Sequence, residues 1–414
     1  MFLESIKSWK LLSALQRSIL QLNFLFGLSR GIVIPFLFLE LKDRYGASLT
    51  AISAIVSLSI LTRILGSLAG GYGADNYDKR KLILGGALLN SFCFLGLAVK
   101  SSLSVAGAIY LTINLLQSAY RTVFSTVIGE SIKKEETRIA YAFFHASQNL
   151  AMGLGALLGA WIMGISGESI YIVCFAALFI FSLLIYKNPS FKNLEFKDKT
   201  SSNNQRSNQS NKKTLSFLIN LKVSRKVFIL ISLNTVLVLC YGVFNEILGV
   251  MFNAAEISLK YVGSLFSLNA ILIVLFQVPI ANRTKSWSFN KSIRISTVLF
   301  AAYLAALYTM YQSQPLLWAA LAVTLFTGAE MLHVSVMNAE VNHHSNEFNR
   351  GRNFGILNAS WSAGFGLGPA FIAYISDKSS FAFASLMLML VLLLASFTLL
   401  TLFNNKKLEL QHVS

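Results

Sequence analysis

Seven ionisable side chains fall inside long apolar stretches of this 414-residue chain. Four lie in the N-terminal half and three in the C-terminal half: Arg30, Arg63, Arg121 and His145, then Glu246, Glu330 and His333. An ionisable side chain inside a bilayer is costly, so such residues usually mark the path of a substrate or a proton. The division into a basic first half and an acidic second half therefore points to transport of a charged molecule.

Three of these residues are arginines, whose planar guanidinium groups bind carboxylates and phosphates through paired hydrogen bonds. We expect Arg30, Arg63 and Arg121 to bind an anionic or zwitterionic substrate, with Asn149 and Asn269 as polar partners. The alternative is structural. The arginines would then pair internally with the acidic residues, and the two amides would only hold helices together.

Glu246, Glu330 and His333 are candidates for proton coupling. A carboxylic acid in a low-dielectric cavity can gain and lose a proton near neutral pH. Glu330 and His333 lie one helical turn apart and form a candidate relay, and Glu246 is the second candidate. His145 stands alone in its stretch, and we interpret it as a core histidine.

Apolar runs long enough to cross a bilayer would position these residues. The chain is 55% hydrophobic and 13% charged, with a mean hydropathy of +0.60, whereas a soluble protein carries about 25% charged residues. A spanning helix needs roughly 20 residues. Twelve runs predict such helices: 18–41, 49–70, 82–99, 104–128, 140–165, 168–187, 227–252, 260–281, 292–312, 315–338, 353–375 and 381–403. The expected fold is an all-α membrane protein with twelve transmembrane helices.

The twelve runs divide into two sets of six. Residues 1–187 and 226–414 are each predicted to form a six-helix bundle, and the polar, basic segment 188–225 a cytoplasmic linker between them. A weak internal repeat supports this division, because Gly153–Ala156 aligns with Gly366–Pro369 in the corresponding place of the second half. We therefore expect two bundles related by a parallel pseudo-repeat.

Positive charges are distributed unequally between the loops. Apart from the three internal arginines, few of the 35 Lys and Arg residues fall opposite the termini; these are Lys42, Arg44, Lys100, Lys260 and Lys378. The positive-inside rule then predicts a multi-pass protein of the cytoplasmic (inner) membrane with both termini in the cytoplasm. The net charge of +17 fits loops beside anionic lipids. We expect a monomer whose partners are membrane lipids and a small-molecule substrate. We expect no binding of nucleic acid.

The sequence has no pattern typical of an enzyme. It lacks a glycine-rich phosphate-binding loop, and no Ser/His/Asp cluster falls at one membrane depth. Cys93, Cys174 and Cys240 lie in apolar runs without the spacing of metal ligands. We expect no enzymatic activity, no metal and no cofactor.

A short charged turn separates the second and third apolar runs. Its Gly71, Ala74, Asp75, Lys79 and Arg80 resemble the loop signature G-x-L-A-D-R-x-G-R-K of the major facilitator superfamily, although three other positions differ. A carboxylate can latch onto the N-terminus of a neighbouring helix. The resemblance implies that Asp75 does so in the outward-facing state. Gly71, Asp75, Lys79 and Arg80 are therefore the predicted conformational gate.

Small residues follow one face of the fifth run. Gly155 and Gly159 resemble part of the helix 5 signature G-x-x-x-G-P-x-x-G-G of superfamily antiporters, and Gly368 and Pro369 fall in the related run 353–375. These four residues are predicted to allow close helix packing. General packing and a hinge that specifies the direction of transport are the two alternatives.

The resemblance is closest to the drug:proton antiporter branch of the superfamily, through the loop signature, Pro35 and Gln277–Pro279. It implies a secondary active transporter that works by alternating access. The internal arginines favour proton-coupled export of an amphipathic, carboxylated molecule such as a metabolite, an antibiotic or a siderophore. The alternatives are import of the same class of molecule and, more distantly, a membrane sensor that transports nothing.

Overall fold

The computed structural model describes residues 8–10, 12–33, 41, 44–99, 101–133, 136–163, 167–188 and 223–405. The first half contains α2 (Ala14–Val33), α4 (Leu49–Asn76), α5 (Lys79–Ala98), α6 (Leu103–Ser131), α7 (Thr137–Met163) and α8 (Ser169–Lys187). The second contains α10 (Arg225–Gly242), continued by η5 (Val243–Ile247) and α11 (Leu248–Ala254), then α12 (Leu259–Thr284), α13 (Phe289–Met310), α14 (Pro315–His343), α15 (Arg350–Ser376) and α16 (Phe381–Asn404). Each of the twelve predicted runs thus holds a helix, as expected for the all-α fold. Pro35 and most of the predicted linker lie outside the described residues.

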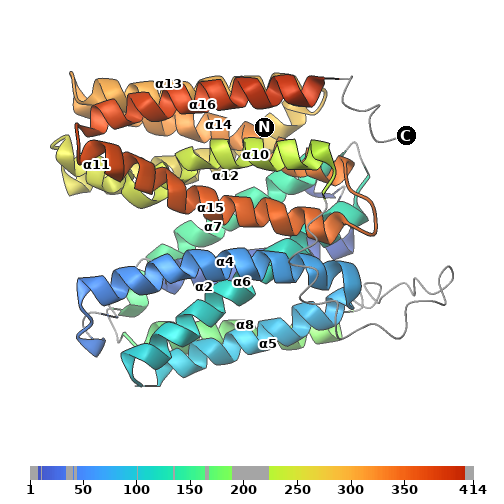
Figure 1. The fold of residues 1–414 in the computed structure, drawn as a ribbon. Helices are drawn as coiled ribbons and strands as arrows, with labels where there is room; N and C mark the ends of the chain where they lie inside the picture. Colours follow the sequence, from blue (N-terminus) through green and yellow to red (C-terminus); the bar gives the residue numbers. More distant parts are fainter. Residues whose placement is uncertain are drawn as a thin grey trace.

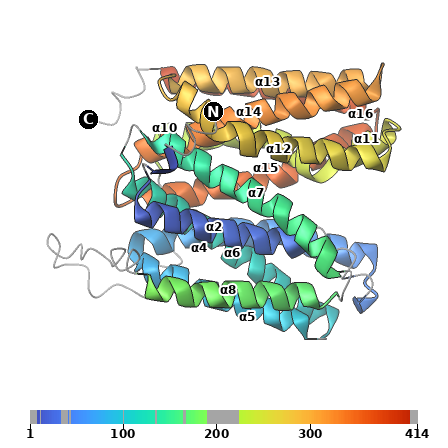
Figure 2. The same cartoon turned by 180° about the vertical axis from the view of Figure 1, so that it is seen from behind.

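The helices form two bundles, α2–α8 and α10–α16, that lie against each other in Figures 1 and 2. In the first bundle α2 packs on α7, α4 on α6, and α5 on α8. In the second bundle α10 packs on α15, α12 on α14, and α13 on α16. The same pattern therefore recurs six helices later, as a parallel repeat requires. Between the bundles, α4 packs on α15, and α7 packs on α12 and α14.

Seven of the described helical rods are apolar enough to cross a membrane by length and composition alone. They are α5, α8, the rod formed by α10, η5 and α11, then α12, α13, α14 and α16. Polar residues in the membrane are tolerated where they face a protein interior or a water-filled cavity. Arg30 lies on α2, Arg63 on α4 and Arg121 on α6, so these three helices are expected to line one.

Glycines allow the closest helix contacts in both bundles. A Cβ added at Gly155 would lie 2.6 Å from the Leu28 carbonyl oxygen of α2, and one at Gly368 would clash with the backbone of Leu239 in α10. Gly159 is buried on α7, and Pro369 lies within α15 beside the backbone of α10. Gly155 and Gly159 thus lie on α7, and Gly368 and Pro369 lie on the symmetry-related helix α15. A hinge function for them stays a prediction.

A Gly368→Ala substitution is expected to destabilise the protein by about 1–3 kcal/mol, the usual cost of overpacking a tight contact. The matched control is Gly85→Ala, because a Cβ at Gly85 meets no atom within 4 Å. This control should leave stability unchanged or raise it by up to about 1 kcal/mol through helix propensity. Thermal unfolding of both variants in the same detergent measures the difference. Equal melting temperatures would contradict the close contact.

Candidate functional site

A pocket of about 80 Å³ lies between the bundles, and α2, α4, α6, α7 and α15 line it. Its polar lining consists of Asn23, Arg30, Arg63, Ser67, Asn114, Gln117, Ser118, Arg121, Gln148, Asn358 and Ser362. A cavity needs at least about 10–15 Å³ to hold one water molecule, so this pocket has room for a few waters or a small charged group.

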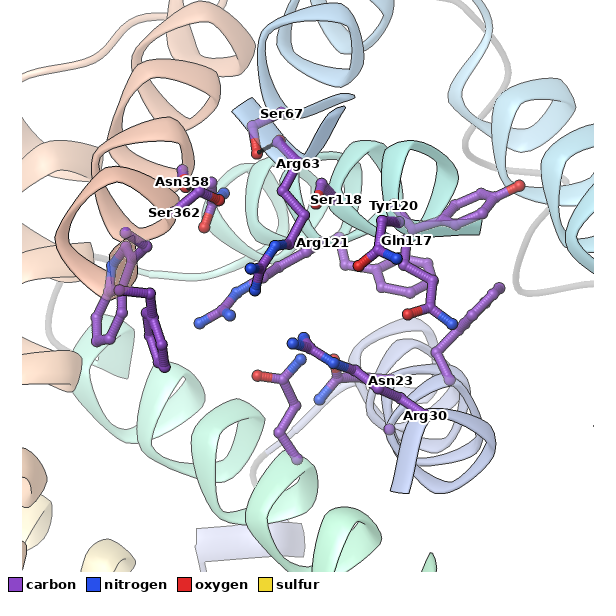
Figure 3. Close-up of a pocket in the computed structure, with 17 residues that line it drawn as sticks. Asn23, Arg30, Arg63, Ser67, Gln117, Ser118, Tyr120, Arg121, Asn358 and Ser362 are labelled. Atoms are coloured by element: carbon purple, nitrogen blue, oxygen red, sulfur yellow. Dashed lines mark hydrogen bonds between the residues drawn. The ribbon is translucent and has the colours of Figure 1, made fainter. Parts of the chain in front are cut away.

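The three predicted arginines meet in this pocket. Figure 3 shows the guanidinium groups of Arg30, Arg63 and Arg121 pointing into the same space from three different helices. Arg121 lies over the ring of Trp361, with 5.4 Å from the guanidinium carbon to the ring centroid. The Arg30 Nε atom is buried without a hydrogen-bond partner in the described part of the chain.

No carboxylate neutralises this positive charge within the described lining. Glu246 interacts electrostatically with Arg30, but its side chain is exposed on the π-helical segment η5 and does not line the pocket. Arg63 also interacts with Arg30, and the two like charges repel each other. Three guanidinium groups thus converge with no acidic partner among the described lining residues, and guanidinium groups pair readily with anions. Binding of substrate by these arginines stays a prediction.

Aromatic rings form the remainder of the pocket wall. Phe26 and Tyr120 stack at 4.7 Å on the side of the first bundle. Trp361 and Phe365 come from α15 of the second bundle. Sequence analysis missed Gln117 and Trp361. One available signal was the spacing of Asn114, Gln117 and Arg121, which places three polar groups on one face of α6.

A second polar cluster joins the two bundles beside the pocket. His145 Nε2 of α7 lies 3.1 Å from Glu330 Oε1 of α14. Asn269 Nδ2 donates to Glu330 Oε2 at 3.2 Å, and Asn149 Nδ2 lies 3.0 Å from His145 Nε2. Asn149 and Asn269 thus flank an ion pair and do not line the pocket described above. Their expected contact with substrate stays a prediction.

Glu330 and His333 have different partners in the structure. The His333 Nδ1 atom lies 3.1 Å from the Tyr241 hydroxyl, and its ring packs against Trp361 at 5.7 Å. Glu330 contacts His145 on the other bundle instead. The two residues are therefore not the direct relay that their spacing suggested, because in this conformation each side chain reaches a different neighbouring helix. Their part in proton coupling, and that of Glu246, stays a prediction.

Asp75 of the predicted gate contacts the N-terminus of α15, and its action as a gate stays a prediction. The carboxylate of this residue accepts hydrogen bonds from the backbone N–H groups of Gly351 at 2.7 Å and Arg352 at 2.8 Å. These are the second and third N–H groups of α15, where a helix dipole favours negative charge. A Cβ added at Gly71 would lie 2.5 Å from the Gly351 carbonyl oxygen. Glycine at both positions thus lets α4 and α15 meet.

We call this region the linker end, because α8 ends and α10 begins there (Figure 1). Two further hydrogen bonds join the bundles at the linker end. Asn342 Nδ2 donates to the carbonyl oxygen of Gly129 at 3.2 Å, and an Arg138 N–H donates to the carbonyl oxygen of Thr284 at 2.9 Å.

Lys79 and Arg80 connect helices within the first bundle. The Lys79 ammonium lies 3.3 Å from the Glu130 carboxylate of α6. Arg80 donates to the Tyr186 carbonyl oxygen of α8 at 3.1 Å. Both cations thus support α5 from neighbouring helices, which fits the packing role implied by the loop signature. Their contribution to gating stays a prediction.

Comparison with known proteins identifies the family. A sequence model of the Major Facilitator Superfamily matches residues 19–339 and 227–412. The chain belongs to this superfamily. It is 24% identical over 376 residues to the uncharacterised MFS-type transporter YttB of Bacillus subtilis (strain 168), with 90% of each chain covered. It is also 24% identical over 143 residues to the Na(+), Li(+), K(+)/H(+) antiporter of Planococcus maritimus, with 33% of each covered.

A solved structure shows the same superfamily fold. The human organic anion transporter MFSD10 (TETRAN) superposes with a TM-score of 0.70 at 14% identity, covering 93% of this chain and 99% of that one. This superfamily member is therefore a multi-pass membrane transporter of small molecules rather than an enzyme. The drug:proton antiporter branch stays a prediction.

Proposed function

We propose that this superfamily member is a secondary transporter of a small, amphipathic organic anion, most simply a carboxylate. The observation that supports this substrate class is the convergence of Arg30, Arg63 and Arg121 on one pocket that has no acidic residue in its described lining. The stacked rings of Phe26 and Tyr120 offer an apolar surface to the rest of the substrate. A neutral or cationic substrate would meet three uncompensated positive charges there.

The position of the pocket supports transport by alternating access. The first bundle supplies the arginines and the second supplies Asn358 and Trp361, so a bound anion contacts both. The linker end is closed by Asp75 and its hydrogen-bond partners. We place this end and both termini in the cytoplasm, because positive charges collect there. This conformation then faces outward, and breaking the Asp75 contacts exposes the pocket to the cytoplasm.

For the coupling, we propose export in exchange for protons across the cytoplasmic membrane. The antiporter from Planococcus maritimus supports exchange, although it matches only a third of this chain. Import by symport is the second candidate, since the same pocket serves either direction. The pocket is complete within one chain, so a monomer suffices.

Purified protein in proteoliposomes tests this proposal. Labelled aromatic and aliphatic carboxylates are supplied outside, and the vesicle interior is made acidic. Antiport is expected to drive uptake well above that of protein-free vesicles. Passive diffusion of a weak acid runs the opposite way under this gradient, so it cannot mimic the result. Uptake only with an acidic exterior would contradict antiport, and movement of amines alone would contradict the anionic substrate.

A further inference from the structure

One buried ion pair links the two bundles in the interior of the protein. His145 belongs to α7 of the first bundle and Glu330 to α14 of the second, and the two side chains are each only 8% exposed. His145 lies one turn from Gln148, which lines the arginine pocket. A change of charge in this pair therefore acts both on the contact between the bundles and beside the substrate.

The surrounding hydrogen bonds place a hydrogen on one nitrogen of the His145 imidazole. Gln277 Nε2 donates to the carbonyl oxygen of Met331 at 3.0 Å, so Gln277 Oε1 is the atom that faces His145. This oxygen lies 3.1 Å from His145 Nδ1 and can only accept. Nδ1 therefore carries a hydrogen. The remaining nitrogen, Nε2, lies 3.1 Å from Glu330 Oε1 and 3.0 Å from the amide nitrogen of Asn149. It accepts from Asn149 when it carries no hydrogen, and donates to Glu330 when it does.

The side chains that hydrogen-bond to the His145–Glu330 pair are uncharged amides. Asn149 of α7, and Asn269 and Gln277 of α12, contribute neutral amides. Two described titratable groups interact electrostatically with the pair. Tyr241 of α10 interacts with Glu330, and His333 of α14 interacts with His145. From α6, Arg121 of the pocket interacts with Tyr241. The α15 helix contributes the neutral Trp361 near His333.

We infer that His145 and Glu330 together form the binding site of the coupling proton. The inference rests on the proposed proton-coupled transport and adds His145 as a partner that sequence analysis left in the core. In the closed state the pair is an imidazolium and a carboxylate joined by the hydrogen on Nε2. A second proton, taken from water on one side, forms an O–H bond on the carboxyl group. The two groups then lose their charge attraction, and α7 and α14 separate.

Opening at the linker end exposes the pair to the other side, where the carboxyl group returns the proton to water. The closed contact re-forms only after this release, so one proton crosses for each conformational cycle. A raised proton concentration outside therefore drives opening toward the linker end. This is the direction that export in exchange for protons requires.

Glu330→Gln and His145→Gln separate the proton site from the substrate site. In both variants, acid-driven net uptake is expected to fall to the level of protein-free vesicles. Exchange of labelled for unlabelled anion, which needs no net proton movement, is expected to fall much less and to lose its pH dependence. The double swap His145→Glu with Glu330→His restores the pair and should recover part of the net uptake. Glu340→Gln is the matched control, because Glu340 lies on the same helix but pairs with His344.

Infrared difference spectra between acidic and neutral pH test the site without any substrate. The wild type is expected to show a protonated-carboxyl band that Glu330→Gln lacks and His145→Gln shifts. Normal coupling in Glu330→Gln, or an unchanged band, would overturn the inference. A wild type that exchanges no carboxylate would overturn the proposed function instead, and the infrared result would still decide the proton site.

Discussion

Arg30→Gln is expected to weaken binding of the carboxylated substrate by about 30- to 1000-fold. Removing one partner of a desolvated, hydrogen-bonded charge pair costs about 2–4 kcal/mol, and each 1.4 kcal/mol is a factor of ten. Arg30 has a buried Nε without a partner and no ion pair in the described part of the chain. Its guanidinium is therefore available to an anion. Equilibrium binding of a labelled carboxylate to purified protein measures the loss.

Matched variants separate charge from geometry at this position. Arg30→Lys keeps the charge but loses the planar pair of donors, so we expect a smaller loss of about tenfold. Arg294→Gln removes an exposed cation of α13 and should leave binding unchanged. If Arg30→Gln binds the anion as tightly as the wild type, the pocket arginines are structural and the substrate class is wrong.

Gly351→Val is expected to hold the linker end open. A Cβ at this position would clash with the Gly71 carbonyl oxygen and lie 2.7 Å from Asp75 Oδ1. The added side chain therefore separates α4 from α15 and breaks both hydrogen bonds of the Asp75 carboxylate. An overpacking cost of about 1–3 kcal/mol falls on the closed state alone, which shifts the equilibrium toward opening by about 5- to 150-fold.

Labelling of a cysteine at position 74 measures this shift, because Ala74 is 1% exposed in the closed state. Impermeant maleimide reaching the linker end should react at least about ten times faster in Ala74→Cys with Gly351→Val than in Ala74→Cys alone. Gly263→Val on α12, where a Cβ meets no atom within 4 Å, is the control. Equal labelling rates in all three would show that the Asp75 contact does not hold the linker end closed.

The helices were predictable because a bilayer demands about 20 apolar residues for each crossing. Every predicted run holds a helix. The π-helical turn at Val243–Ile247 was not predictable. It lies within a continuous apolar run, and hydropathy does not distinguish a π-turn from an α-helix.

The residue types of the candidate site were visible in the sequence, but their contacts were not. The three arginines indicated an anion from their residue type alone, whereas their convergence depends on how α2, α4 and α6 are rotated. Glu330 and His333 seemed natural partners from their spacing on one helix. Glu330 instead contacts His145 across the bundle interface. A contact between residues so distant in sequence has no local signal, so His145 was taken for a core residue.

Thermal unfolding of the purified protein with matched ligand pairs tests the anion pocket most directly. Each carboxylate is compared with its isosteric primary amide, which keeps the shape and removes the charge. A ligand that binds the folded state at 100 times its Kd stabilises it by about 2.7 kcal/mol. We predict that at least one carboxylate raises the melting temperature, that its amide does not, and that Arg121→Gln abolishes the difference. Equal stabilisation by acid and amide in the wild type would contradict an anion-binding pocket.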